Sequence, residues 1–130
     1  MDAIAWATET FAPMNLVWSP LPPVKKYPND THVQGLTMDK VAGIDLVLTN
    51  KAIRMATLIT PINAAYMPLC TYAIAAIAGT DKTQADMWLA RILSQLKTQR
   101  VKEIQATLKQ IRGIASITTI GVFTLQLTAR

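Results

Sequence analysis

Few residues of this chain have the types and spacing that catalysis or metal binding needs. His32 is the only histidine and Cys70 the only cysteine, and they belong to very different segments. The sequence has no CxxC, HExxH or glycine-rich phosphate-binding motif, which are spacings that hold metals or phosphates. Asp39 and Asp45 could pair as acid and base, but most such pairs are caps or surface charges. We therefore predict that the protein is not an enzyme and holds no metal or cofactor.

Cys70 is predicted to be a small buried hydrophobe. It lies between Leu69 and Thr71 in an apolar run, without the basic neighbour or helix N-terminus that activates a thiol. The N-terminal residues MDAIAWATETFAP carry two acids and no Lys or Arg. Secretory signals begin with basic residues and mitochondrial presequences are rich in arginine. We therefore expect a non-secreted protein that works in a membrane or within a large assembly.

The composition is apolar and basic. Hydrophobic residues make up 51% of the 130 positions and charged residues only 16%, against roughly 25% charged residues in typical soluble domains. This balance suits a membrane protein, a subunit with large buried interfaces, or an unusually apolar soluble domain. The formal net charge of +5 suits an anionic partner such as lipid headgroups, nucleic acid or an acidic protein face.

The segment 81–112 carries the clearest helical pattern and most of the basic residues. Apolar residues from Leu89 to Ile111 recur at spacings of three and four, which predicts a long amphipathic helix that ends near Gly113. Six cations are predicted to form a surface that faces the phosphates of lipid or nucleic acid: Arg91, Lys97, Arg100, Lys102, Lys109 and Arg112. The alternative is an ordinary solvated helix face.

The N-terminal third is predicted to be a short helix followed by an extended arm. Residues 2–12 have helical apolar spacing, and Pro13 interrupts it. Residues 13–35 hold five of the seven prolines, which favours an extended segment that lies on a partner. The expected contact residues of this arm are Trp18, Pro20, Pro22, Pro23, Lys25 and Lys26. Residues 1–35 would form this helix and arm, and residues 36–130 a single helical domain.

Two segments fit both a helix and strands. In 37–60, Val41, Ile44 and Leu48 suit one face of a helix, whereas the many β-branched residues suit two strands that turn at Asn50-Lys51. We favour the helix there. In the C-terminal tail, 113–129, apolar residues alternate with Thr and Gln, which predicts a strand. The tail could instead be an apolar helix.

The uncharged run from Thr60 to Thr80 raises the question of a membrane span. Residues 55–79 are long enough to cross a bilayer, but they include Asn63, Pro61 and Pro68, which disfavour a lipid-facing helix. We prefer burial in a core or subunit interface.

Together these patterns predict a predominantly α-helical, non-enzymatic structural subunit, either a virion component or an accessory subunit of a membrane complex. Its partners would be protein subunits, in a self- or hetero-oligomer, together with anionic lipid or nucleic acid, and it would have no small-molecule substrate. One alternative is a small integral membrane protein with spans near 55–79 and 113–129. Another is a nucleic-acid-associated assembly protein.

Overall fold

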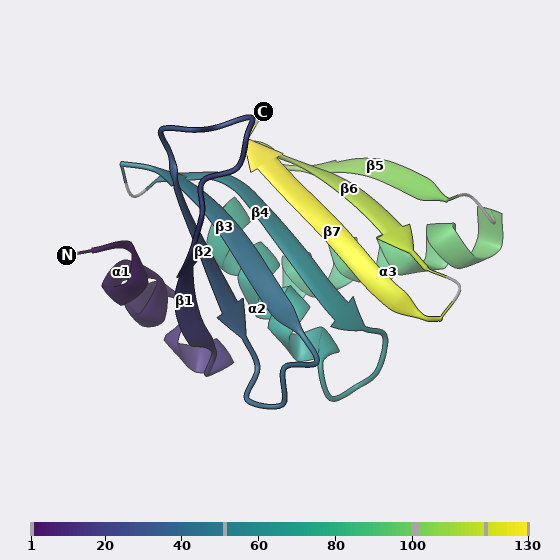
Figure 1. Ribbon diagram of the computed structural model, residues 1–130. Helices are drawn as coiled ribbons and strands as arrows, with labels where there is room; N and C mark the ends of the chain where they lie inside the picture. Colours follow the sequence, from purple (N-terminus) through teal and green to yellow (C-terminus); the bar gives the residue numbers. More distant parts are fainter. Residues whose placement is uncertain (1, 51, 100–101, 119, 130) are drawn as a thin grey trace.

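A computed structural model describes residues 2–50, 52–99, 102–118 and 120–129 of the chain (Figure 1). The helices are α1 (Ala3–Thr10), the 3-10 turn η1 (Ala12–Met14), α2 (Met67–Ala78) and α3 (Lys82–Gln99). The strands are β1 (Val17–Leu21), β2 (Thr31–Leu36), β3 (Gly43–Thr49), β4 (Ala52–Pro61), β5 (Glu103–Leu108), β6 (Ile111–Ile117) and β7 (Val122–Ala129).

All seven strands form one antiparallel sheet in the order β1-β2-β3-β4-β7-β6-β5. The prediction of a predominantly α-helical fold is therefore wrong. The first four strands form a meander, and α2 and α3 then carry the chain to the far side of the sheet. The last strand, β7, closes the sheet by pairing with β4, where Met55 lies opposite Thr128. Residues 13–35 contribute β1 and β2 to this sheet.

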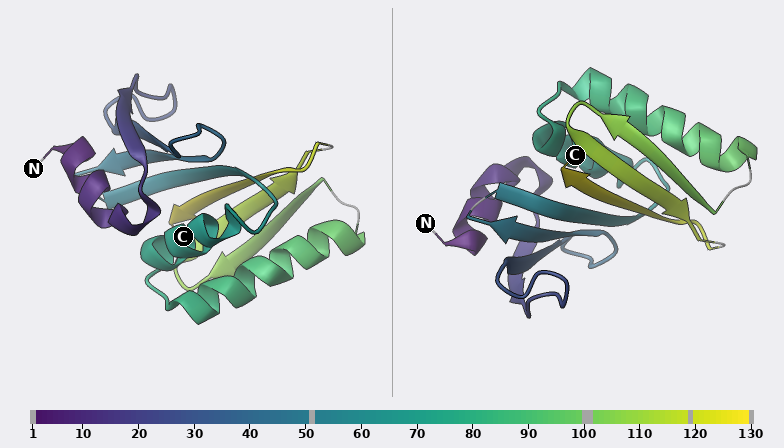
Figure 2. Two further views of the ribbon diagram at one scale, coloured as in Figure 1. Left: turned by 90° about the horizontal axis from the view of Figure 1, so that it is seen from below. Right: turned by 90° about the horizontal axis from the view of Figure 1, so that it is seen from above.

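The two faces of the sheet differ because side chains alternate along each strand. On one face, the covered face, buried apolar side chains pack against the helices, and they include Leu46, Leu58 and Leu125. Figure 2 shows α2 and α3 together on this side. The opposite side, the open face, has no helix over it among the described residues, and Figure 1 looks onto it.

The long helix predicted over 81–112 ends at Gln99, and the chain continues as the β5–β6 hairpin. Ile104, Leu108 and Ile111 explain the error. Their spacing of four and three suits a helix, but the same residues also face one side of a hairpin that turns after Leu108. Lys109 takes a left-handed backbone conformation in that turn, with φ 54°.

The helix favoured for 37–60 is also wrong, since the rival strand pair forms there as β3 and β4. Asn50, with φ 50°, lies at the turn. Lys51 is outside the described residues. The β-branched residues of these strands gain more from cross-strand packing than from a helix, in which their side chains lose freedom.

The uncharged run is divided between a strand and a short helix. Pro61 ends β4, and Pro68 occupies the first turn of α2, where a missing backbone N–H costs nothing. Gly79, with φ 71°, caps the C-terminus of α2. Cys70 and Ile74 bury the helix against the sheet. This run therefore belongs to the protein core.

Neither segment of the membrane-protein alternative forms a single helix. Residues 55–79 comprise most of β4, a loop and α2, while 113–129 comprise most of β6 and all of β7. Among the described residues, every helix is too short or too polar to cross a bilayer. The strand predicted in the tail is confirmed as β7, whose Phe123, Leu125 and Leu127 are all buried. The short N-terminal helix is confirmed as α1.

Candidate functional site

Cys70 and His32, the two residues with potential catalytic chemistry, lie on opposite sides of the sheet. Cys70 is fully buried in α2 on the covered face, and burial raises the pKa of its thiol to about 12. His32 lies on the open face, because its strand neighbour Val33 points into the core. The sheet therefore separates the thiol from the imidazole, and the two cannot form a nucleophile–base pair.

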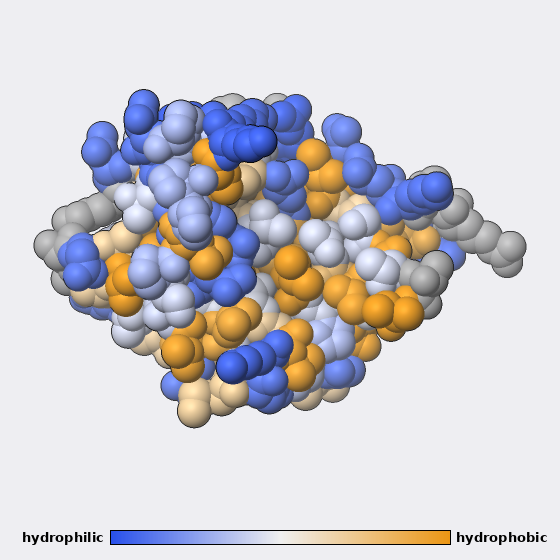
Figure 3. Space-filling view, viewed as in Figure 1, coloured by the Kyte–Doolittle hydropathy of each residue, from blue (hydrophilic) through white to orange (hydrophobic). Residues whose placement is uncertain are grey.

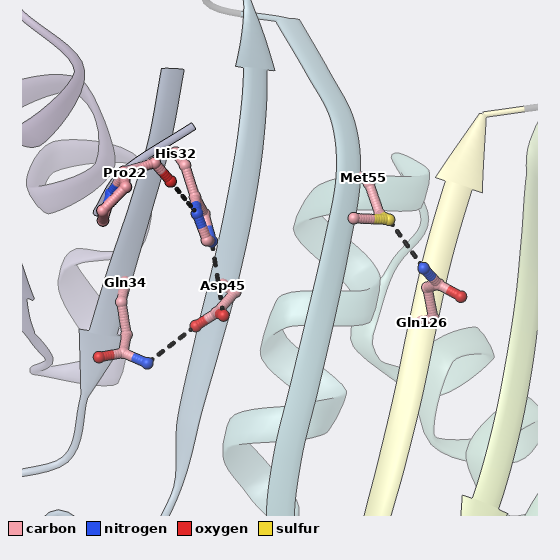
Figure 4. A network of polar contacts seen from close by, with 6 residues as sticks. All are labelled: Pro22, His32, Gln34, Asp45, Met55 and Gln126. Carbon is pink, nitrogen blue, oxygen red and sulfur yellow. Dashed lines mark hydrogen bonds and ion pairs between the residues drawn. The ribbon is translucent and has the colours of Figure 1, made fainter. Parts of the chain in front are cut away.

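His32 instead belongs to a polar network on the open face (Figure 4). Its Nδ1 donates to the carbonyl of Pro22 at 3.0 Å, since a carbonyl can only accept. Its Nε2 lies 3.5 Å from Oδ2 of Asp45, whose Oδ1 accepts from Gln34 at 3.1 Å. Both ring nitrogens are thus engaged by the protein. The network ties the β1–β2 loop to β2 and β3, which is a structural role.

Asp39 is not a partner of Asp45 but a cap of the β2–β3 loop. Its carboxylate accepts from the Thr37 hydroxyl, the Val41 amide and the Tyr66 hydroxyl. These bonds, that of Thr37 first, lower the pKa of Asp39, and the Asp39 bond raises the pKa of Tyr66. Among the described residues, no group of His, Cys, Asp and Glu is suitable for holding a metal ion.

The predicted anion-facing cations do not share one surface. Arg91 and Lys97 are exposed on α3, whereas Lys102 precedes β5. Lys109 lies in the β5–β6 turn, and its Nζ donates to the carbonyl of Gly79 at 3.2 Å. Arg112 is exposed on β6. Arg100 is outside the described residues. The single basic helix that would have aligned these side chains does not exist.

The residues predicted to form a partner-contact arm are also divided. Trp18 packs on the covered face, with its ring 5.8 Å from that of Phe11. Pro20 lies in β1, and the carbonyl of Pro22 holds His32. Pro23, Lys25 and Lys26 are exposed in the β1–β2 loop. Pro20 and Pro22 are exposed too, so Trp18 alone is turned largely into the protein.

The β5 edge of the sheet is the strongest candidate for an interaction site. Within the described ranges β5 pairs only with β6, so one side of its backbone has no neighbouring strand there. It contains no proline or glycine, and Glu103, Gln105 and Thr107 are exposed. An unpaired regular strand offers a row of N–H and C=O groups to another strand.

Helix α3 supports this edge from the covered face. The indole Nε1 of Trp88 donates to the carbonyl of Thr107 at 3.0 Å. The ring of Trp88 lies over Gly113, where an added Cβ would be only 2.7 Å from the indole. Beside it, Met87 is 62% exposed. A groove of about 400 Å³ also runs between α2 and α3, lined by apolar residues such as Leu89 and Leu93.

A second groove, of about 320 Å³, lies between α3 and the β5–β6 hairpin. Met87, Trp88 and Arg91 line it from α3, and Thr107 and Lys109 line it from the hairpin. Sequence analysis singled out Arg91 and Lys109 but did not predict that they line one groove. The pattern that could have revealed it, the alternation of Ile104, Ala106 and Leu108 with Gln105 and Thr107, also fitted a helix.

Comparison with known proteins gives no match to a protein family, a curated protein or a solved structure.

Proposed function

We propose that this protein is a non-enzymatic structural subunit that assembles with copies of itself through the β5 edge. The observation that carries this proposal is the unpaired, regular strand Glu103–Leu108 at one end of the sheet. Assembly would extend the sheet from one subunit into the next by backbone hydrogen bonds.

Self-pairing of β5 suits the side chains on both faces of the strand. A two-fold axis perpendicular to the sheet makes the two strands antiparallel and keeps the helices of both copies on one side. With Gln105 on the axis, Gln105 would meet Gln105 of the second copy on the open face and Glu103 would meet Thr107, so like charges do not meet there. On the covered face Ile104 would meet Ala106.

The exposed side chain of Met87 supports the same interface. It is 62% exposed beside the groove between α3 and the hairpin. A second copy that extends the sheet would bring its own α3 to this end of the molecule. Covering Met87 and the apolar wall of the groove would add hydrophobic stabilisation of roughly 25 cal/mol per Å² buried.

The test is the oligomeric state of two matched variants, Gln105→Lys and Gln126→Lys. Gln126 lies opposite Ile114, which lies opposite Gln105, so the two glutamines belong to one cross-strand row of the open face. One glutamine lies at the edge and the other lies on an interior strand. Light scattering coupled to size-exclusion chromatography over a concentration series would measure the association.

We expect the wild-type protein and Gln126→Lys to associate and Gln105→Lys to shift toward monomer. The physical reason is that two edge lysines would face each other across the new strand pair. A wild-type protein that stays monomeric across the series, or equal behaviour of both variants, would overturn the proposal. Circular dichroism of each variant would verify that the sheet is intact.

A further inference from the structure

Basic side chains from three separate segments gather along one rim of the open face. Lys25 and Lys26 are exposed in the β1–β2 loop, Arg54 lies near the start of β4, and Arg112 near the start of β6. The strand register places Arg54 and Arg112 near each other. Met55, the residue after Arg54, lies opposite Thr128, and Arg112 lies opposite Thr128 from the other side. Figure 3 shows hydrophilic side chains gathered along this upper rim. We call these four cations the basic rim.

Arg54 is held in place on this rim. Its Nε donates to the Thr49 hydroxyl at 3.1 Å and lies 2.6 Å from Oδ2 of Asp30, with which Arg54 forms an ion pair. Its guanidinium lies over the Tyr27 ring, 4.7 Å from the centroid. These recorded contacts use Nε and the flat face of the group, and a guanidinium has four more N–H donors on its two Nη atoms. The side chain is 45% exposed, so a ligand can reach them.

The open face beside the basic rim carries neutral hydrogen-bonding groups. On β4, β7 and β6 the exposed or half-buried side chains of this kind are Thr57, Thr124, Gln126, Thr128 and Ser116. The carboxylate of Asp45 is held by His32 and Gln34, and Glu103 lies at the far end of the β5 edge. Hydroxyl and amide side chains next to Arg and Lys are the groups that contact phosphates and sugars in nucleic-acid complexes.

The exposed apolar side chains argue against a lipid surface as the ligand of this rim. Val17 and Ile59 are 53% and 46% exposed, and both lie in the row that also holds Leu36 and Thr124, near the opposite rim of the face. Membrane-surface binding needs apolar side chains next to the cations. Here Lys26 and Arg54 lie over the Tyr27 ring. Arg112 lies between Thr107 and Thr128, while Val17 and Ile59 are at the other rim.

We infer that the basic rim binds the phosphodiester backbone of a nucleic acid that lies across the open face. This inference does not require self-association, because all four cations belong to one chain. Most of the binding energy would be electrostatic, so the affinity would fall steeply with salt. Base stacking would contribute little, because the face offers few aromatic side chains.

The experiment compares two double variants with equal loss of charge, by fluorescence anisotropy of a labelled RNA oligonucleotide over a salt series. Lys25→Gln with Lys26→Gln neutralises the loop of the basic rim. Lys82→Gln with Lys97→Gln is the control, because both residues are exposed on α3, on the other side of the sheet and outside the groove beside β5. All four substitutions lie at exposed positions, and circular dichroism would verify the fold.

We expect the rim variant to weaken binding by about tenfold and to lower the salt slope by roughly two, with little change in the control. Equal effects of the two variants, or no salt-dependent binding by wild type, would overturn the inference. If polyglutamate displaces the labelled RNA as well as unlabelled RNA does, the rim binds acidic protein instead, and the inference is overturned. Repeating the titration at protein concentrations at which light scattering shows only monomer separates this result from assembly, because all four cations belong to one chain.

Discussion

The two edges of the sheet, β1 and β5, share one packing motif but differ in how far they are protected against a further strand. At each edge a tryptophan lies against a glycine of the second strand: Trp18 against Gly35, and Trp88 against Gly113. At the first edge the tryptophan belongs to the edge strand itself, and α1 and η1 pack beside it through Phe11. At the other edge the tryptophan belongs to α3, and its indole bonds the edge strand through the carbonyl of Thr107.

A proline in β1 adds a second difference between the two edges. Pro20 lies within β1 and has no N–H to offer to a further strand. β5 has no proline over Glu103–Leu108, so every residue keeps its backbone N–H, although the Thr107 carbonyl already accepts from Trp88. A protein that must stay monomeric protects both edges by such devices. This difference leaves β5, and not β1, as the edge at which we propose that a second copy adds its strand.

The largest expected effect comes from removing the two tryptophans. Trp88→Ala should lower the free energy of unfolding by about 3–5 kcal/mol, because Trp88 is almost fully buried and leaves a large cavity. Trp18→Ala should cost less, because Trp18 is only half-buried. Urea unfolding would measure both losses, and Trp88→Phe would separate packing from the lost hydrogen bond. Equal losses would show that the β5 edge is supported no better than the β1 edge.

A smaller effect is expected from filling the two glycine sites. An added Cβ would lie 2.7 Å from the Trp88 ring in Gly113→Ala and 2.9 Å from the Trp18 ring in Gly35→Ala. Overpacking typically costs about 1–3 kcal/mol. We expect the larger cost at Gly113, because the buried Trp88 has less room to shift. The urea midpoints of the two variants would test this order, and a reversed order would contradict it.

The smallest effect is expected at Asp39, which contacts neither edge and serves as a reference. Its pKa is lowered by bonds from Thr37 and Tyr66, so its stabilising contribution is present above its unfolded-state pKa. That contribution is lost as the pH falls through the lowered folded-state pKa. Asp39→Asn should therefore reduce the acid dependence of the unfolding midpoint and leave association through β5 unchanged. If the acid dependence of Asp39→Asn is the same as that of the wild type, the capping role of Asp39 is wrong.

Several features could be predicted from local sequence alone. The alternation in VFTLQLTA predicted a strand, and the helical spacing before Pro13 predicted α1. The apolar neighbours of Cys70 predicted its burial. These predictions hold because each depends on a signal that lies within one element: a period, a breaker or a flanking residue.

The site could not be predicted in the same way. The segment 81–112 was expected to be one basic helix, so its cations were grouped on one surface that does not exist. Arg54 was missed because its role depends on Asp30 and Tyr27, which come from the β1–β2 loop. The β5 edge was missed because an edge exists only once the order of the strands is known.

The sequence by itself determined the burial of Cys70, the break of the first helix before Pro13 and the strand in the tail, because side-chain polarity, alternation and the backbone limits of proline act locally. The tertiary structure decided between helix and strand for Ile104, Leu108 and Ile111, whose spacing satisfies both. It also decided that β7 pairs with β4, far away in the chain. The physical reason is that a strand obtains its backbone hydrogen bonds from a partner, whereas a helix obtains them from itself.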